Sequence, residues 1–210
     1  ETLFLAEHSA FGSSIAAYRR DIKPCYVSSV FHGAYRREVF EKVGFFDERL
    51  IRTEDNEMHY RIRQAGYRIR FNPKIRSQQF IRNSLKDVIK QKYSNGYWIG
   101  RTLFISPRCL QIYHLVPFLF VLALAATTAV GFAWTWLPLA ALGFLYGLVN
   151  LPISLMTFIR AKNKNASMVV LPAVFLIMHI VYGWGTLIGT IKGFFGTKEP
   201  FDVFDVPDPA

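Results

Sequence analysis

The chain has 210 residues, of which 51% are hydrophobic, and it carries a net charge of +10. It has two cysteines, no CxxC pair and no histidines at metal-ligand spacing, which argues against a disulfide framework and a structural zinc site. Up to Cys109 the chain holds 20 Lys or Arg and 11 Asp or Glu, whereas Leu115–Ile159 holds no charged residue. We therefore predict a basic domain that folds in water, followed by a region that belongs in a bilayer.

The first residues, ETLFLAEHSAF, lack a positively charged stretch ahead of a long apolar one, so no signal peptide is predicted. The chain begins without Met, and we expect further sequence upstream. The excess of positive charge favours anionic headgroups of membrane lipids or phosphate-bearing substrates as partners. Nucleic acid is not expected, because no nucleic-acid-binding motif accompanies the charge.

Short elements are predicted through the first third of the chain. Small residues from Ser9 to Ala17 indicate a loop. Alternating residues over Tyr26–Phe31 favour a strand that ends at Gly33. Arg36–Val43 has helical character, and Gly44 follows it as a C-cap.

A second helix is predicted to begin at Glu54, with Thr53 as its N-cap, and to end at Gly66. Its first turn carries three acidic residues, which the helix dipole favours at that position, namely Glu54, Asp55 and Glu57. Tyr67–Phe71 alternates again and favours a second strand, closed by an Asn-Pro pair.

Ser84–Tyr93 has an apolar and a basic face and predicts an amphipathic helix. Two interpretations stay open for it. A basic face with an aromatic end suits the membrane surface, and the same pattern also suits the solvated face of a helix in a water-soluble domain.

Three apolar stretches follow, each near the roughly 20 residues that cross a hydrocarbon core: Leu115–Phe132, Leu137–Phe158 and Met168–Ile191. The segment Arg160–Lys164 is strongly basic and should lie in the cytoplasm with the basic domain, which places the acidic tail after the third stretch outside. Several glycines make the third stretch the least secure span, because such a helix can pack closely on a neighbour or lie partly in the interface.

The segment FHGAYRREVFEKVGFFDERLIRTEDNEMHYRIRQAGYRIRFNP resembles the acceptor-side half of family 2 glycosyltransferases, which are inverting enzymes of the GT-A fold. The resemblance is closest to the membrane-bound branch that builds exopolysaccharides such as succinoglycan. It extends over roughly Gly33 to Trp98, and over the membrane region in architecture only.

The resemblance implies an α/β fragment of a GT-A, Rossmann-like domain in residues 1–109. An all-α transmembrane region of about three helices would occupy residues 110–195, and an acidic tail residues 196–210. The implied localisation is the inner (plasma) membrane, with several spans and a cytoplasmic catalytic part.

The resemblance also implies roles for the acidic residues. Inverting transfer needs a base that takes the proton of the acceptor hydroxyl, and the family's base falls on Asp55, with Glu54 in support. The alternative is that these carboxylates only complement the dipole of a first helical turn.

Four further residues are candidates for substrate binding. Gly33 would let the backbone approach a sugar, or it is a simple turn glycine. Arg61 would bind a diphosphate, or it pairs with an acidic residue one helical turn away, which we favour. Tyr97 and Trp98 stand where processive relatives carry Gln-x-x-Arg-Trp, but the Arg is missing and the spacing is longer. Two interpretations stay open for Trp98: it supports an acceptor sugar, or it anchors the chain at the membrane interface.

No Asp-x-Asp motif precedes Gly33, so we expect the residues that hold the metal and most of the nucleotide to lie outside this chain. In the full enzyme a divalent metal such as Mg²⁺ or Mn²⁺ would neutralise the departing diphosphate. The implied partners are a nucleotide-sugar donor and a lipid-linked or glycan acceptor. A non-catalytic membrane scaffold or transport-associated subunit is the competing hypothesis.

Overall fold

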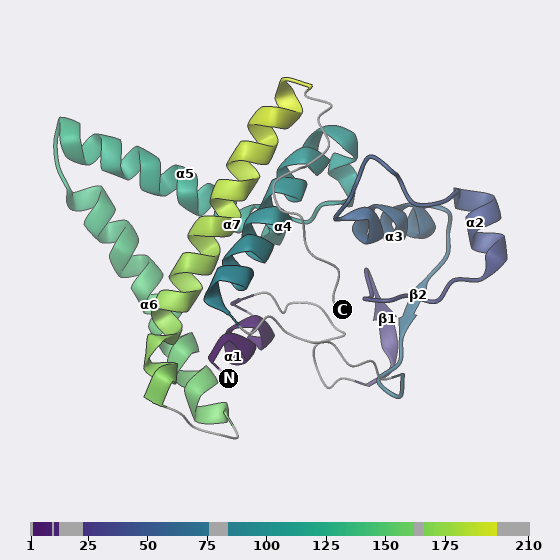
Figure 1. Cartoon of the computed structure of the whole chain (residues 1–210), viewed down its shortest axis with the longest axis horizontal. Coiled ribbons are helices and arrows are strands. Elements are labelled where there is room, and N and C mark those ends of the chain that lie inside the picture. Colours follow the sequence, from purple (N-terminus) through teal and green to yellow (C-terminus); the bar gives the residue numbers. More distant parts are fainter. Residues whose placement is uncertain (1, 10, 13–22, 76–83, 162–165, 197–210) are drawn as a thin grey trace.

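The computed structural model describes residues 2–9, 11–12, 23–75, 84–161 and 166–196. Figure 1 shows three layers: a small α/β part, a central pair of long helices, α4 and α7, and a hairpin of two long helices, α5 and α6. Three predicted segments lie largely outside the described residues: the loop Ser9–Ala17, the basic loop Arg160–Lys164 and the tail 196–210.

The α/β part contains strands β1 (Cys25–Val27) and β2 (Ile69–Phe71), which pair antiparallel with Tyr26 opposite Arg70. Helices α2 (Arg37–Val43) and α3 (Glu54–Gln64) lie between them in sequence. The apolar face of α3 packs on α2 in a small core that contains Val39, Met58 and Ile62. These are the only two strands in the described part of the chain, and they do not by themselves establish the predicted Rossmann-like sheet.

Most of the predicted elements of this part are confirmed, with shorter strands. The first strand ends at Val27, because the chain leaves the sheet before the predicted Phe31. Gly44 follows α2 with φ 80°, a left-handed backbone that favours glycine. Helix α3 begins at Glu54 as predicted, but the side chain of Thr53 makes no capping hydrogen bond, so that part of the prediction is wrong.

Helix α4 (Leu85–Ile105) is much longer than the predicted amphipathic helix. Ser84 caps it, with Oγ accepting a hydrogen bond of 3.1 Å from the backbone N–H of Asp87. Neither interpretation of its basic face describes Lys92, which is 3% exposed and forms a 2.9 Å ion pair with Glu7. Glu7 belongs to α1 (Thr2–His8), a helix that was not predicted.

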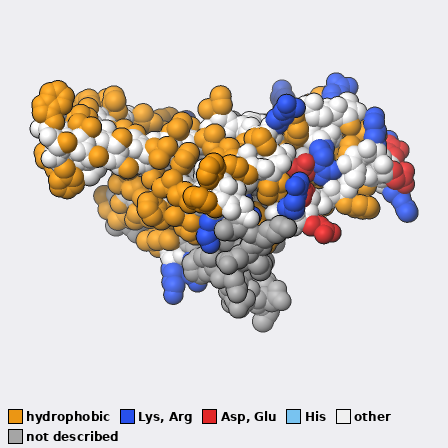
Figure 2. Space-filling view, turned by 90° about the horizontal axis from the view of Figure 1, so that it is seen from above, with side chains coloured by type: hydrophobic (Ala, Val, Ile, Leu, Met, Phe, Trp, Pro, Cys, Tyr) orange, Lys and Arg blue, Asp and Glu red, His pale blue; other side chains and the backbone are white. Residues whose placement is uncertain are grey.

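The three predicted apolar stretches are confirmed as the helices α5 (Ile112–Ala133), α6 (Leu137–Arg160) and α7 (Leu171–Phe194). Each is long and apolar enough to cross a membrane. Short 3₁₀ turns, η2 (Pro107–Cys109) and η3 (Ala166–Val170), precede α5 and α7. In Figure 2 apolar side chains cover the end of the molecule away from the α/β part, whereas the charged ones gather mainly at the other end.

Four glycines let α4 and α7 pack backbone to backbone, and we call Gly96, Gly100, Gly185 and Gly189 the glycine seam. A Cβ on Gly96 would lie 2.0 Å from the carbonyl oxygen of Tyr182, and one on Gly189 would lie 2.0 Å from that of Tyr97. Any side chain there would force the helices apart. The close neighbour expected for the third apolar stretch is therefore α4.

Candidate functional site

The acidic turn, Thr53–Glu57, begins α3 and is seated on α4. Thr53 has φ 70°, an uncommon conformation for a residue with a branched side chain. Its hydroxyl shares a hydrogen bond of 2.7 Å with the hydroxyl of Thr102, which in turn donates to the carbonyl oxygen of Trp98 at 2.6 Å. Arg52 adds a second link, because its guanidinium donates to Asn95 Oδ1 at 2.8 Å. The backbone that carries the acidic residues is thus fixed by the long helix.

Asp55 lies on the face of α3 that carries His59, one helical turn later. Its Oδ1 accepts a hydrogen bond of 2.7 Å from the backbone N–H of Asn56. His59 is fully buried, with Nδ1 3.0 Å from Ser29 Oγ and Nε2 2.7 Å from Tyr35 Oη. No role was predicted for His59, which is a lone histidine in the sequence, although its position four residues after Asp55 puts the two on one face of a helix.

Burial and the charge of Asp55 set the protonation of this group. Burial lowers the pKa of His59, and the nearby Asp55 opposes this shift only in part, so the ring is held neutral. Burial raises the pKa of the Tyr35 hydroxyl, and the negative charge of Asp55 adds to that effect. Tyr35 and His59 are therefore neutral hydrogen-bonding groups beside a carboxylate.

Glu54 has a different environment from its neighbour. Its Oε2 is buried and has no hydrogen-bond partner among the described residues. Burial is the main cause that raises the pKa of this carboxyl, and the charge of Asp55 raises it further. Glu54 is therefore more easily protonated than an exposed glutamate.

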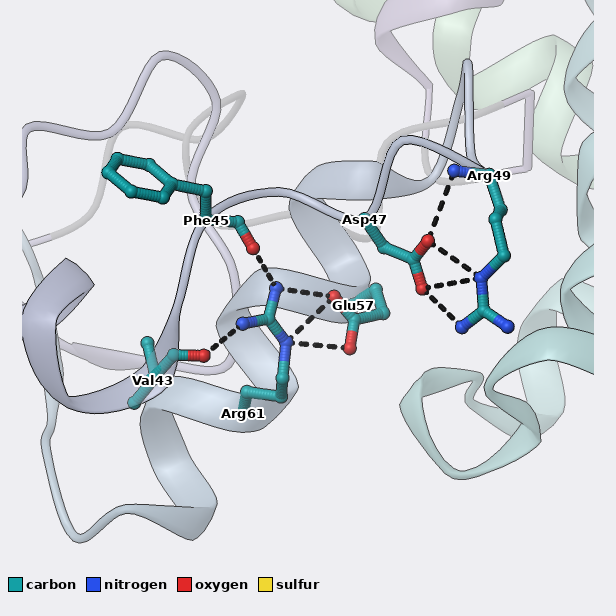
Figure 3. Close-up of polar contacts among 6 residues, drawn as sticks. All are labelled: Val43, Phe45, Asp47, Arg49, Glu57 and Arg61. Atoms are coloured by element: carbon teal, nitrogen blue, oxygen red, sulfur yellow. Dashed lines mark hydrogen bonds and ion pairs between the residues drawn. The ribbon is translucent and has the colours of Figure 1, made fainter.

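Glu57 and Arg61 form a separate structural unit on another face of α3 (Figure 3). Arg61 Nε lies 2.8 Å from Glu57 Oε1, and Nη2 donates to the carbonyl oxygen of Phe45 at 2.7 Å. Nη1 donates to the carbonyl oxygen of Val43, the last residue of α2. The guanidinium thus joins α3 to the chain that leaves α2, and the local pairing favoured for Arg61 is observed.

Gly33 lies against Tyr35, where an added Cβ would be 2.6 Å from the phenol oxygen. Tyr97 and Trp98 are 4% and 5% exposed and pack with Leu50, which precedes the acidic turn. The structure therefore brings Tyr97 and Trp98 beneath the acidic turn and Gly33 beside the Tyr35–His59 group, whereas Arg61 lies apart from Asp55. Substrate binding by Gly33, Arg61, Tyr97 and Trp98 stays a prediction.

The described residues contain no group of three or more His, Cys, Asp or Glu side chains that could hold a metal ion. Glu54 and Asp55 alone do not make such a site. What the acidic turn offers chemically is a carboxylate whose Oδ2 accepts no hydrogen bond within the described part of the chain.

Comparisons with known proteins give the family that the chain resembles and two relatives. The sequence model described as "Glycosyl transferase family group 2" matches residues 15–188. A protein of Methanococcus voltae, the dolichyl N-acetyl-alpha-D-glucosaminyl phosphate 3-beta-D-2,3-diacetamido-2,3-dideoxy-beta-D-glucuronosyltransferase, is 27% identical over 170 residues, which are 80% of this chain and 49% of that protein. The succinoglycan biosynthesis protein ExoA of Rhizobium meliloti (strain 1021) is 31% identical over 96 residues, 46% of this chain and 28% of the relative.

The chain spans about half the length of the first of these relatives and less of the second. No solved structure matches it.

Proposed function

The chain belongs to the family 2 glycosyltransferases, and from this premise we propose that it forms the acceptor side of an inverting sugar transferase. The donor would be a nucleotide-sugar and the acceptor a lipid-linked or other glycan, in exopolysaccharide or cell-envelope glycan synthesis. The observation that carries the proposal is the acidic turn, which presents Asp55 from a backbone fixed on α4.

Asp55 is the general base in this proposal. As the acceptor oxygen attacks the anomeric carbon, its proton passes to Oδ2 of Asp55, the new carbon–oxygen bond forms and the bond to the nucleotide diphosphate breaks on the opposite face. Oδ1 is already held by the N–H of Asn56, which orients the carboxylate. Glu54, whose pKa is raised by burial, would support Asp55 from the adjacent position of the acidic turn.

The neighbours of Asp55 would position the acceptor. The phenol oxygen of Tyr35, held by the buried ring of His59, would offer a neutral hydrogen-bonding group to the acceptor. Gly33 lets Tyr35 lie against the backbone, since an added Cβ there would be 2.6 Å from the phenol oxygen. For Tyr97 and Trp98 we propose an indirect contribution, because both are buried under the acidic turn. A divalent metal, Mg²⁺ or Mn²⁺, would neutralise the diphosphate in the full-length enzyme through ligands outside this chain.

The active site would face the cytoplasm of the cell, in a multi-pass protein of the plasma membrane. The positive charge of Arg160–Lys164 supports this orientation, because such segments are retained on the cytoplasmic side.

The test is Asp55→Asn in the full-length enzyme, which keeps the size of the side chain and removes the proton acceptor. We expect kcat to fall by about 10²- to 10⁴-fold, the usual contribution of a general base, while binding of the nucleotide-sugar stays close to that of the wild type. Asp47→Asn is the matched control. Asp47 pairs with the exposed side chain of Arg49 (Figure 3), so this substitution should lower kcat by less than about threefold.

Wild-type turnover in Asp55→Asn would remove this residue from the mechanism. A full-length wild-type protein that transfers no sugar from any nucleotide-sugar would instead favour the scaffold hypothesis.

A further inference from the structure

The middle of the third apolar helix lies one helix away from the acidic turn. Asn95 of α4 binds Arg52, which directly precedes the turn. The next residue, Gly96, lies against the backbone of Tyr182 on another side of α4, where an added Cβ would be 2.0 Å from the carbonyl oxygen of Tyr182. Tyr182 stands near the centre of the apolar stretch Met168–Phe194, so only α4 separates that centre from charged side chains of the α/β part.

Helix α4 follows α7 in the same direction along most of its length. Gly96 meets Tyr182, Gly100 meets Thr186, and Phe104 meets Gly193. Near this last contact Arg101 donates to the carbonyl oxygen of Lys192 at 3.2 Å. An α7 that crossed the bilayer would therefore carry α4 across with it.

Helix α4 is unsuited to a crossing. It carries five charged residues, Lys86, Asp87, Lys90, Lys92 and Arg101, and charged side chains are strongly disfavoured in the hydrocarbon core. Lys92 is paired with a buried carboxylate, that of Glu7, inside the protein. In addition, the polar turn at Arg52 and Thr53 is bonded to the middle and the end of α4.

The hairpin of α5 and α6 leaves α7 at an angle. The first turns of α5 touch α7, because a Cβ on Gly183 would lie 2.1 Å from the carbonyl oxygen of Pro117. Figure 1 shows α5 and α6 meeting far from α7, where Phe132 and Trp134 are 80% and 87% exposed. Spans of one bilayer usually run roughly side by side, whereas Figure 1 shows α5 and α6 running at steep angles to α7. Helix α6 meets the first part of α7, through Tyr146 with His179 and Asn150 with the carbonyl oxygen of Pro172.

We infer that α5 and α6 cross the membrane as a hairpin, whereas α7 lies along the membrane surface between this hairpin and α4. Helix α7 would contact the boundary between the lipid headgroups and the acyl chains. This region accepts apolar side chains of a helix that does not cross the bilayer. The exposed side chains Trp184, Ile191 and Phe194 would contact lipid there. The end of α7 then lies on the same side of the membrane as the acidic turn.

Cysteine labelling tests this topology. In the full-length enzyme with Cys25 and Cys109 replaced by Ala, single cysteines are placed at Thr135, Asn163 and Asp205 and treated with a membrane-impermeant maleimide before and after the cells are permeabilised. We expect Asp205→Cys to behave like Asn163→Cys, with both protected in sealed cells, and Thr135→Cys to react from outside. Opposite behaviour of the cysteines at 163 and 205 would show that α7 crosses and would overturn the inference.

A second measurement gives the depth of α7. Spin labels at three partly exposed positions, Val170, Ile180 and Ile191, are compared in lipid vesicles by their accessibility to oxygen and to a water-soluble nickel chelate. Similar depths at all three support a helix along the surface, and a label at Ile180 much deeper than the other two overturns it. Neither measurement depends on sugar transfer, so this inference and the proposed function can fail separately.

Discussion

Replacing Arg61 by Met should destabilise the α/β part strongly. The side chain of Glu57 is 7% exposed and is paired with Arg61, so the variant leaves a carboxylate buried without its cation. Breaking a buried pair in this way costs about 3–5 kcal/mol, because the remaining charge has lost its water as well as its partner. The carbonyl groups of Val43 and Phe45 also lose their donor (Figure 3).

The assay is the thermal unfolding midpoint of the full-length enzyme in detergent. For a domain of about 150–250 residues each kcal/mol moves the midpoint by about 2–4 °C, so we expect the transition of the domain that contains Arg61 to fall by about 6–20 °C. Arg63→Met is the matched control, since Arg63 lies on the same helix and donates to one backbone carbonyl, that of Ser28, in an exposed position. Combining Arg61→Met with Glu57→Gln should restore part of the loss, because the second change removes the uncompensated charge.

The opposite outcome would show that Arg61 acts on substrate. If Arg61→Met unfolded within about 2 °C of Arg63→Met yet bound the nucleotide-sugar much more weakly, the guanidinium would be a diphosphate ligand, the alternative that its bidentate geometry allows. The burial of Glu57 also means that Glu57→Gln is a poor control for Asp55→Asn, because it perturbs this pair.

Three further predictions concern α4 and its surroundings. Thr102→Val removes the hydroxyl that holds the acidic turn. The loss of a hydrogen bond worth about 1 kcal/mol should lower kcat about fivefold and leave KM unchanged. Thr102→Ser, which keeps the hydroxyl, should retain the wild-type kcat. Gly189→Leu should overpack the contact between α4 and α7 at a cost of about 1–3 kcal/mol, which lowers the unfolding midpoint by about 2–12 °C. Gly147→Leu should change the midpoint little, because there is open space around Gly147. Burial raises the pKa of Cys109 to about 11, so maleimide should modify Cys25 before Cys109 at pH 8. The rate of modification of Cys109, followed by mass spectrometry, should rise about tenfold per pH unit.

The sequence predicted best what depends on neighbours along the chain. The start of α3, the glycine after α2 and the pair of Glu57 with Arg61 all arise from groups within a few residues of one another. Each apolar stretch is also a local pattern, and all three appear as helices.

Contacts between distant segments account for the failures. Lys92 follows the pattern of an exposed basic face, but its partner Glu7 lies on a helix 85 positions earlier, and no local pattern reveals that pair. Thr53 was expected to cap its own helix, and its hydroxyl instead meets Thr102 on α4. The glycines of α7 did indicate close packing, but nothing local identified α4 as the neighbour.

The charges of α4 determine where the acidic turn lies relative to the membrane. A charged residue at the bilayer centre costs about 2.5–3.5 kcal/mol even on the most permissive scales. Two of the charges of α4 at that depth would therefore cost roughly 5–7 kcal/mol, which is as much as the whole stability of many domains. Because α4 must stay at the surface and Thr102 and Asn95 hold the acidic turn on it, Asp55 stays within reach of the surface too. A sugar carried on a membrane lipid is presented at that level, which favours a lipid-linked acceptor over a free glycan.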